Sequence, residues 1–154
     1  LTGYITEGQI VLSRELHQKD IYPPIDVPPS LSRLMKDSIG ESYTRADHKA
    51  VSTQLYAAYA RVKDVRSLAS VIGEEELSQV DQAYIRFGHA FETYFVGQGQ
   101  NEDRSVDRTL DLGWQVLSML PRDELTRISE ALLDDYYRPD QTADDFEAER
   151  EVVR

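Results

Sequence analysis

The amino-acid sequence predicts a mainly α fold, in which a C-terminal helical bundle follows a few short strands. Apolar residues recur every three or four positions through most of residues 44–137, and this is the spacing of amphipathic helices. Short β-prone runs are confined to residues 4–12. A segment with four prolines among residues 23–29 separates these runs from the helical part.

Residues 4–12 predict two short strands. Residues 4–6 are β-prone, residues 7–9 have the composition of a turn, and residues 10–12 form a short apolar run. Such a run is typical of a buried strand in a parallel sheet, and one or two strands are not stable alone in water. We therefore expect the remaining strands to lie in a longer chain, and the start at Leu1 without a methionine fits that expectation.

Ser13 is placed to cap a short helix that runs to about Lys19, with Leu12 and Leu16 on its inner side. Residues 22–33 then form the most distinctive segment of the chain. Its four prolines forbid a helix and offer no amide donors to a sheet, so a stiff extended loop is predicted. This loop leads to Arg33.

A polar linker at residues 36–43 precedes a series of amphipathic helices. We expect helices over residues 44–61 and 65–72, a helix from Ser78 to about residue 96, a helix capped by Ser105 and ended near Pro121, and a last helix or pair of helices over residues 125–136. Gly73 and Gly97 are placed to end two of them. The predicted apolar faces consist of Val51, Leu55, Ala58, Val65, Leu68, Val80, Tyr84, Phe87, Phe91, Phe95, Val106, Leu110, Trp114, Leu117, Leu120, Leu125, Ile128, Leu132, Leu133 and Tyr136.

The charge distribution excludes some partners. The net charge is −11, so the surface repels phosphate backbones and nucleic acid is not expected as a partner. No apolar run is long enough to insert into a membrane, and the chain has no cysteine for disulfides or thiolate metal sites. Residues 138–154 are polar and acidic and predict a disordered tail, which only Phe146, Val152 and Val153 could anchor.

No complete catalytic or metal-binding motif is present. The sequence lacks a phosphate-binding P-loop and a dinucleotide-binding glycine motif. His17, His48 and His89 lie far apart and lack ligand spacing. A self-contained hydrolase is therefore disfavoured, and the chain is not expected to be an enzyme on its own.

Several motifs, taken in order, resemble the non-catalytic B subunit of archaeal- and vacuolar-type (A/V-type) rotary ATPases. These motifs are TGYITEGQI (2–10), SRELH (13–17), IYPPIDV (21–27), PSLSRL (29–34), TR and DH (44–48), QLYAAYA (54–60), LDLGW (110–114) and LSMLP (117–121). The resemblance covers about residues 1–137. It implies that residues 1–40 are the last part of a truncated α/β nucleotide-binding domain, residues 41–137 a helical C-terminal domain, and residues 138–154 an added tail.

The resemblance implies roles for four residues of the proline segment. In this family the arginine of the Ser-x-Ser-Arg motif, here Arg33, acts in trans as an arginine finger in the catalytic site of the neighbouring A subunit. Ser32 and Arg33 would then contact ATP or ADP with Mg at the subunit interface of the intact complex, and no cofactor is expected for the fragment alone. Tyr22 and Pro23 either line a degenerate nucleotide pocket or pack the loop onto the sheet.

The resemblance also implies a contact with the central stalk rotor subunits. Glu75, Glu76 and Asp81 align with an acidic loop that faces the rotor in related subunits, although a solvated helix start explains these acids nearly as well. The chain would be cytoplasmic and peripheral to the membrane, in the head of a proton- or sodium-translocating ATP synthase. Residues 41–43 depart from the family pattern, and together with the tail they leave open a stand-alone helical interaction module derived from this subunit.

Overall fold

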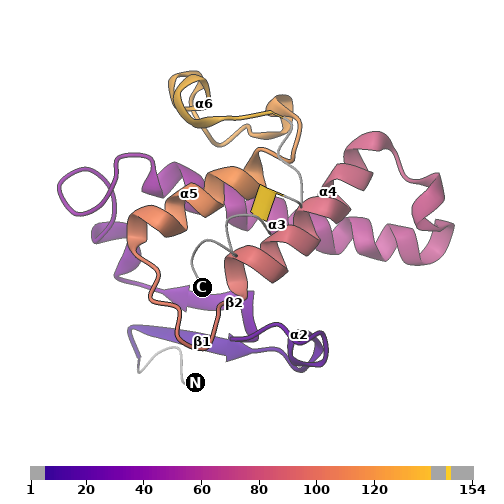
Figure 1. Cartoon of the computed structure of the whole chain (residues 1–154), viewed down its shortest axis with the longest axis horizontal. Helices are drawn as coiled ribbons and strands as arrows, with labels where there is room; N and C mark the ends of the chain where they lie inside the picture. The colour runs from indigo at the N-terminus through magenta and orange to yellow at the C-terminus, as the bar shows by residue number, and fades with distance from the viewer. Residues whose placement is uncertain (1–5, 140–144, 147–154) are drawn as a thin grey trace.

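The computed structural model describes residues 6–139 and 145–146, and the predicted mainly α fold is confirmed there (Figure 1). The elements occur in the order β1 (Gly8–Leu12), α2 (Arg14–Gln18), β2 (Ile25–Ser32), α3 (His48–Ile72), α4 (Gln79–Ala90), a π-helix (Phe91–Val96), α5 (Val106–Leu117) and α6 (Glu130–Tyr136). Short 3-10 turns lie at Met35–Asp37, Glu74–Glu76 and Arg122–Glu124. Figure 1 shows the two strands and α2 on one side of the helical layer and α6 on the other.

The interpretation of residues 10–12 as a buried parallel strand is wrong. β1 pairs with β2 in the antiparallel sense, and the side chains of Ile10 and Leu12 are 72% and 66% exposed. Successive side chains of a strand point to opposite faces, so Ile10 and Leu12 share the outer face while Val11 turns toward the rest of the molecule. Residues 4–5 of the other predicted strand lie outside the described residues.

The proline segment is a strand rather than the predicted loop. A large irregular bulge at residues 27–30 makes this possible. Gln9 faces Leu31 and Val11 faces Asp26, so residues 27–30 stand opposite Ile10 alone. Pro28 and Pro29 fall inside this bulge, where a missing amide N–H costs no ladder hydrogen bond. The Ser30 hydroxyl closes the bulge, because it accepts from the Val11 N–H at 3.0 Å and donates to the Asp26 carbonyl at 2.6 Å.

The short helix α2 forms as predicted, but Leu12 is exposed and does not lie on its inner side as expected. The Ser13 hydroxyl accepts from the Leu16 N–H at 3.3 Å, and Leu16 is buried. The chain leaves the helix through Asp20, whose φ of 58° lies in the left-handed region. Asp is one of the few residues other than Gly that tolerate this region at modest cost, which allows an aspartate at this turn.

A single helix, α3, replaces the two predicted between residues 44 and 72. It has 25 residues and contains neither Gly nor Pro, so the polar stretch around Lys63 and Asp64 is an exposed face and not a break. It begins four residues later than predicted. The Thr44 hydroxyl accepts from the Gly40 N–H at 2.8 Å and so closes the preceding turn rather than a helix. Gly73, with φ of 91°, ends α3 as predicted.

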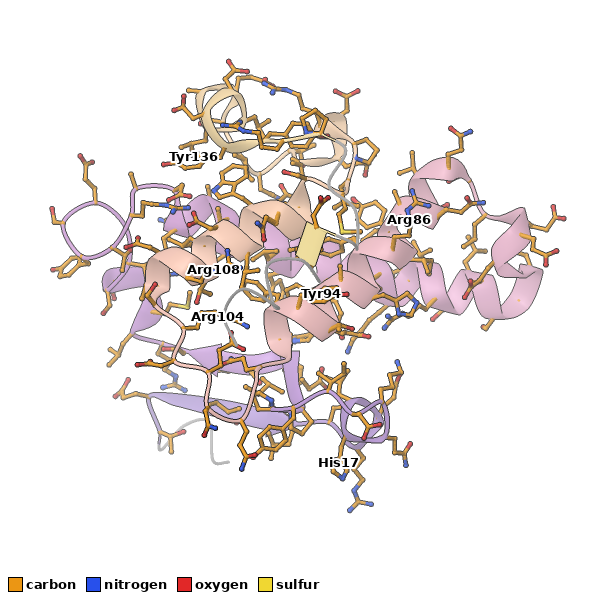
Figure 2. All side chains as sticks on the ribbon, in the orientation of Figure 1. His17, Arg86, Tyr94, Arg104, Arg108 and Tyr136 are labelled. Carbon is orange, nitrogen blue, oxygen red and sulfur yellow. The ribbon has the colours of Figure 1, made fainter. Side chains whose placement is uncertain are left out.

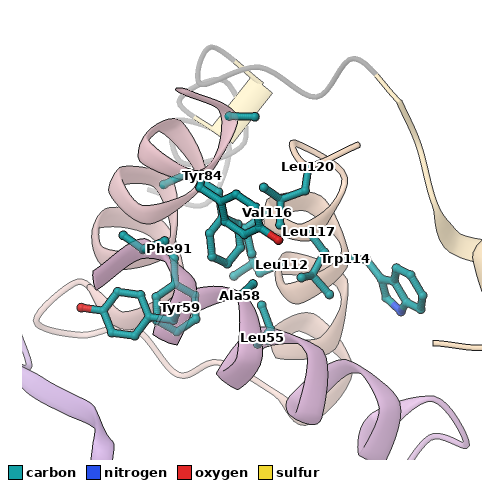
Figure 3. Close-up of a cluster of buried hydrophobic side chains, with 14 of the residues drawn as sticks. Leu55, Ala58, Tyr59, Tyr84, Phe91, Leu112, Trp114, Val116, Leu117 and Leu120 are labelled. Atoms are coloured by element: carbon teal, nitrogen blue, oxygen red, sulfur yellow. The ribbon is translucent and has the colours of Figure 1, made fainter. Parts of the chain in front are cut away.

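The core lies between α3, α4 with its π-helical extension, and α5 (Figure 3). Phe91 is central, since its ring centroid lies 4.7 Å from that of Tyr59, 5.8 Å from Phe87 and 5.1 Å from Phe95. Most predicted inward residues are buried. Val80, Val106 and Leu68 are exceptions: the two valines lie in the first turn of their helices, and Leu68 lies near the end of α3, away from the packed region.

The π-helix ends in a tight turn at Gly97. The Gly97 N–H donates to the Glu92 carbonyl five residues earlier at 2.9 Å, and the next N–H, that of Gln98, donates to the Tyr22 carbonyl at 2.7 Å. The Arg104 guanidinium donates to the carbonyls of Phe95 and Gly97 at 2.7 and 3.3 Å. This turn therefore connects the helical core to the proline segment.

Most of the predicted tail, residues 138–154, lies outside the described residues. The described part comprises Arg138, Pro139 and a helical turn at Asp145 and Phe146. Phe146 is 2% exposed and belongs to the hydrophobic core. It is one of the three anchors that the sequence suggests for the tail.

Gly97→Ala is expected to lower the free energy of unfolding by about 1–3 kcal/mol, as overpacking does. A Cβ at this position would lie 2.5 Å from the Thr93 carbonyl oxygen, which is a backbone atom. Urea denaturation measures the change. Gly99→Ala is the matched control, because its Cβ meets only the Glu102 side chain at 3.7 Å. Equal destabilisation by both variants would contradict this account.

Candidate functional site

Arg33 leaves the end of β2 from a fixed base. Its backbone N–H donates to the Glu7 carbonyl at 2.8 Å, and Ser32 pairs with Gly8 in the strand register. A Cβ at Gly8 would lie 2.7 Å from the Leu31 carbonyl oxygen, so glycine is required for this close approach of the strands. Ser32 and Arg33 are both exposed. The arrangement presents a guanidinium at the surface from a backbone that is bonded to the neighbouring segment at Glu7 and Gly8.

The chain beyond Arg33 turns sharply before α3. Gly40 and Ser42 have φ values of 103° and 86°, both in the left-handed region. Ser42 belongs to the segment that departs from the family pattern, and a residue with a Cβ is strained in this conformation. The departure therefore has a backbone cost at this turn.

Tyr22 and Pro23 stand at the other end of β2. The Tyr22–Pro23 peptide bond is cis, and the Tyr22 side chain is 68% exposed. Such exposure argues against the alternative in which the ring packs the loop onto the sheet. Because Gly8 and Leu12 of β1 mark the two ends of the paired region, about 14 Å of strand separates this pair from Ser32 and Arg33. The structure therefore separates the four residues into two sites.

β2 is fastened to the helical part by side chains of α3. The Tyr56 hydroxyl donates to the Pro28 carbonyl at 3.1 Å, and the Lys63 ammonium lies 3.4 Å from an Asp26 carboxylate oxygen. Both contacts are exposed, and each contributes little alone. Together they connect the strand that carries Arg33 to α3.

The acidic turn lies where α3 meets α4, at the end of the helical layer that projects farthest from the rest of the molecule (Figure 1). Glu75 and Glu76 are exposed. Asp81 differs from them, because it accepts from the Ser78 hydroxyl at 2.8 Å and from Arg61 at 3.0 Å. Only 14% of its side chain is exposed. The surface at this tip is extended by four exposed apolar side chains, those of Leu68, Val71, Ile72 and Val80.

A buried carboxylate secures the start of α3, and sequence reasoning missed it. Asp47 is 1% exposed, and it accepts from the Arg45 guanidinium at 2.7 and 2.9 Å and from the Trp114 indole at 2.6 Å. Burial raises its pKa, but the donors from Arg45 and Trp114 outweigh this and leave the pKa below its usual value. Arg45 also binds Asp111 at 2.6 Å. The motifs TR, DH and LDLGW contain all of these residues. Their joint presence in the sequence was the available signal that these residues contact one another.

A second buried carboxylate connects α3 with the π-helix. Glu92 is 3% exposed and accepts from the Tyr59 hydroxyl at 2.8 Å and from the Arg66 guanidinium at 2.6 and 3.1 Å. Burial raises the pKa of Glu92, while Arg66 and then Tyr59 lower it, and the net pKa lies below the usual value. Burial and the neighbouring Glu92 raise the pKa of Tyr59.

A cavity of about 270 Å³ lies beside the Glu92 network, between α2, β2 and α3. Each charged side chain of its lining already has an ionic partner in the chain; these are Glu15, Asp26, Lys63, Arg66 and Glu92. The cavity thus offers no uncommitted charge to a ligand. Within residues 6–139 and 145–146, no group of three His, Asp or Glu side chains is arranged to hold a metal ion. No helix in this part of the chain has the length and apolar character to cross a membrane.

Comparison with protein families divides the chain at the same place as the fold. Residues 1–32 match the nucleotide-binding domain of the ATP synthase alpha/beta family. Residues 37–137 match the C-terminal domain of V and A type ATP synthase. Arg33 stands at the junction of the two regions. The fold and the site thus define a helical domain attached to the end of a nucleotide-binding domain, and the chain belongs to the V and A type ATP synthase family.

The curated relatives of the chain are beta chains, also called B subunits, of these ATP synthases. The chain is 64% identical over 138 residues to the V-type ATP synthase beta chain of Halothermothrix orenii, covering 90% of this chain and 30% of that protein. It is 61% identical over 137 residues to the B subunit of the A-type ATP synthase of Sulfurisphaera tokodaii, covering 89% and 30%. The chain corresponds to the C-terminal region of this polypeptide and spans about 30% of the length of these relatives. The resemblance drawn from the sequence motifs is confirmed.

A solved structure supports the fold independently. The chain superimposes on the ATP synthase subunit NeqB from Nanoarcheaum equitans with a TM-score of 0.71 and 42% identity. The match covers 78% of this chain and 30% of that one. At this identity the likeness extends beyond the fold to the sequence family.

Glu92→Gln is expected to lower the free energy of unfolding at pH 7 by about 2 kcal/mol, because it removes the charge that pairs with Arg66. The lowered pKa of Glu92 means that its stabilisation is present above its unfolded value of about 4.5 and is lost as the pH falls through the folded value. Urea denaturation at pH 7 and pH 3 should therefore show a smaller pH dependence for the variant. Glu75→Gln, at the exposed tip, should retain the full pH dependence. An unchanged pH dependence in Glu92→Gln would exclude this role.

Proposed function

We propose that the chain is the C-terminal part of the non-catalytic B subunit of an ion-translocating A/V-type rotary ATPase, where it supplies Arg33 in trans to the catalytic A subunit. The observation that carries the proposal is the geometry of Arg33, an exposed arginine on a strand end whose backbone is bonded to the neighbouring strand. In this proposal the region lies in the cytoplasmic head of the complex, peripheral to the membrane.

The chemistry of arginine suits the proposed role. A guanidinium stays charged at all physiological pH values and offers two parallel N–H donors to a phosphate group. ATP held by the A subunit would place its γ-phosphoryl group opposite Arg33, and the guanidinium would stabilise the charge on its oxygens during transfer. The nucleotide and its Mg would be held by the neighbour.

Fixation of the arginine matters as much as its charge. A residue that reaches across an interface stabilises a transition state only when its base does not move away. The hydrogen bond from Arg33 to Glu7, the Ser30 bulge closure and the Tyr56 contact with β2 all restrict this base. Tyr22, exposed at the opposite strand end, would contact a nucleotide through its ring rather than share the phosphate with Arg33.

The acidic tip is proposed as the contact with the central stalk rotor. Glu75 and Glu76 are displayed at the far end of α3 next to exposed apolar side chains, which suits a partner surface with both basic and apolar groups. Asp81 would act at this contact indirectly, since its carboxylate accepts from the hydroxyl of Ser78, the N-cap of α4, and pairs with Arg61.

Arg33→Ala is expected to reduce ATP turnover of the reconstituted complex by about 10³-fold or more while assembly is retained. Arg33→Lys should also be strongly impaired, because it keeps the charge and loses the two-pronged donor. Steady-state ATP hydrolysis measures both, and size-exclusion chromatography checks assembly. Arg14→Ala, which alters another exposed arginine on α2, is the control. Near-normal turnover in Arg33→Ala would exclude the finger role.

The tip contact is tested by site-specific cross-linking in the intact complex. Residues 1–154 contain no cysteine, so Glu75→Cys introduces the only one within this region of the subunit. With a short thiol-reactive cross-linker, this variant should couple to a central stalk subunit. Asp64→Cys, on an exposed face of the preceding helix α3, should not. Equal coupling from both positions, or none from Glu75→Cys, would reject the rotor contact.

A further inference from the structure

The last described residues extend beyond the family domain and still join the core. The family match ends at residue 137. Phe146, nine residues later, is 2% exposed, and its ring stacks on Tyr94 with centroids 4.8 Å apart and an interplanar angle of 10°. Burial of this kind is unusual for an acidic tail, whose composition predicts disorder.

The partner of Phe146 is displayed by the π-helix. Phe87, Phe91 and Phe95 follow one another at four-residue spacing and stack inward. Tyr94 lies on a different side of this helix and is only half-buried. A π-helix is rare and changes which side chains share a face, so it is often found where a helix has a function.

The backbone beneath Tyr94 is fixed by a buried arginine. The side chain of Arg104 is 6% exposed, and it donates to the carbonyls of Tyr94 at 3.2 Å and Phe95 at 2.7 Å. The backbone at Tyr94 and Phe95 is therefore held by contacts outside the tail. We call the surface around the Tyr94 ring, on which Phe146 stacks, the Tyr94 socket.

Charge is arranged to favour the same docking. In the sequence Phe146 is flanked by the acids Asp144, Asp145, Glu147 and Glu149. In the view of Figure 2, the labelled Arg86 of α4 and Arg108 of α5 lie to the two sides of the Asp145–Phe146 turn. An acidic segment that approaches between two arginines gains electrostatic attraction, which aids its orientation.

We propose that Asp145–Phe146 is a docking segment that binds in cis to the Tyr94 socket and so fastens the tail to the π-helix. The segment belongs to this chain and lies outside the family domain, so it is an addition to the function proposed above and does not depend on it. Through the Gly97 turn, the π-helix also contacts Tyr22. The docked segment consequently stabilises the connection between the helical core and the proline segment.

The test is nuclear magnetic resonance on the full 154-residue chain with labelled aromatic rings, which is tractable because the chain has four Phe residues. A nuclear Overhauser effect between the rings of Tyr94 and Phe146 is expected. In a mixture of labelled and unlabelled chains, the effect should remain within one chain. Absence of the contact, or a contact between different chains, would overturn docking in cis.

Substitutions add a second readout. Phe146→Ala should raise the exchange rate of the Gly97 and Gln98 amide hydrogens about tenfold or more, the order expected from loss of one buried aromatic ring. Phe146→Leu should produce a smaller increase, because it keeps apolar contact without ring stacking. Val71→Ala, which removes exposed apolar atoms near the end of α3, is the control. Unchanged exchange in Phe146→Ala would overturn the proposal even if the rings are in contact.

Discussion

Much of the fold depends on the burial of one charge, the carboxylate of Glu92. A buried carboxylate must be paired and hydrogen-bonded, and both of its partners, Tyr59 and Arg66, come from α3. The π-helix is thereby held in one register against α3. This register determines where Gly97 turns and which way Tyr94 faces. A core held by apolar contacts alone would tolerate small rotations of these helices more readily than one with a paired charge.

α3 is the helix that connects two distant parts of the surface, β2 and the acidic tip. Its 25 residues span about 37 Å. Contacts with β2 lie in its first two-thirds, and the acidic tip lies at its C-terminal end. No Gly or Pro interrupts it, so the residues that most often kink a helix are missing from α3. One continuous helix thus joins the strand next to Arg33 to the tip.

Local patterns predicted the helical part well because amphipathic spacing and capping are local properties. Ser13, Ser78 and Ser105 each accept a hydrogen bond at the start of the helix predicted from them. The errors arose where a distant partner decides the outcome. Thr44 closes a turn with Gly40 instead of capping a helix. Pro28 and Pro29 become part of a strand because the Ser30 hydroxyl, in the bulge, bonds to the Val11 N–H of the neighbouring strand. Arg33, Glu75 and Glu76 are exposed, and the roles that the motifs imply for them stay predictions. The ion pair between Asp81 and Arg61 joins residues 20 positions apart, so only the tertiary structure shows it.

The proline bulge of β2 has a consequence for solubility of the strand pair. An exposed sheet edge is a template on which further strands, including those of other molecules, add and lead to aggregation. Pro28 and Pro29 have no amide hydrogen to offer, and the bulge bends the backbone away from the straight path that an incoming strand requires. The outer edge of β2 is therefore a poor template for growth. The residues that form the bulge before Arg33 thus also keep the strand from pairing along its edge with another molecule.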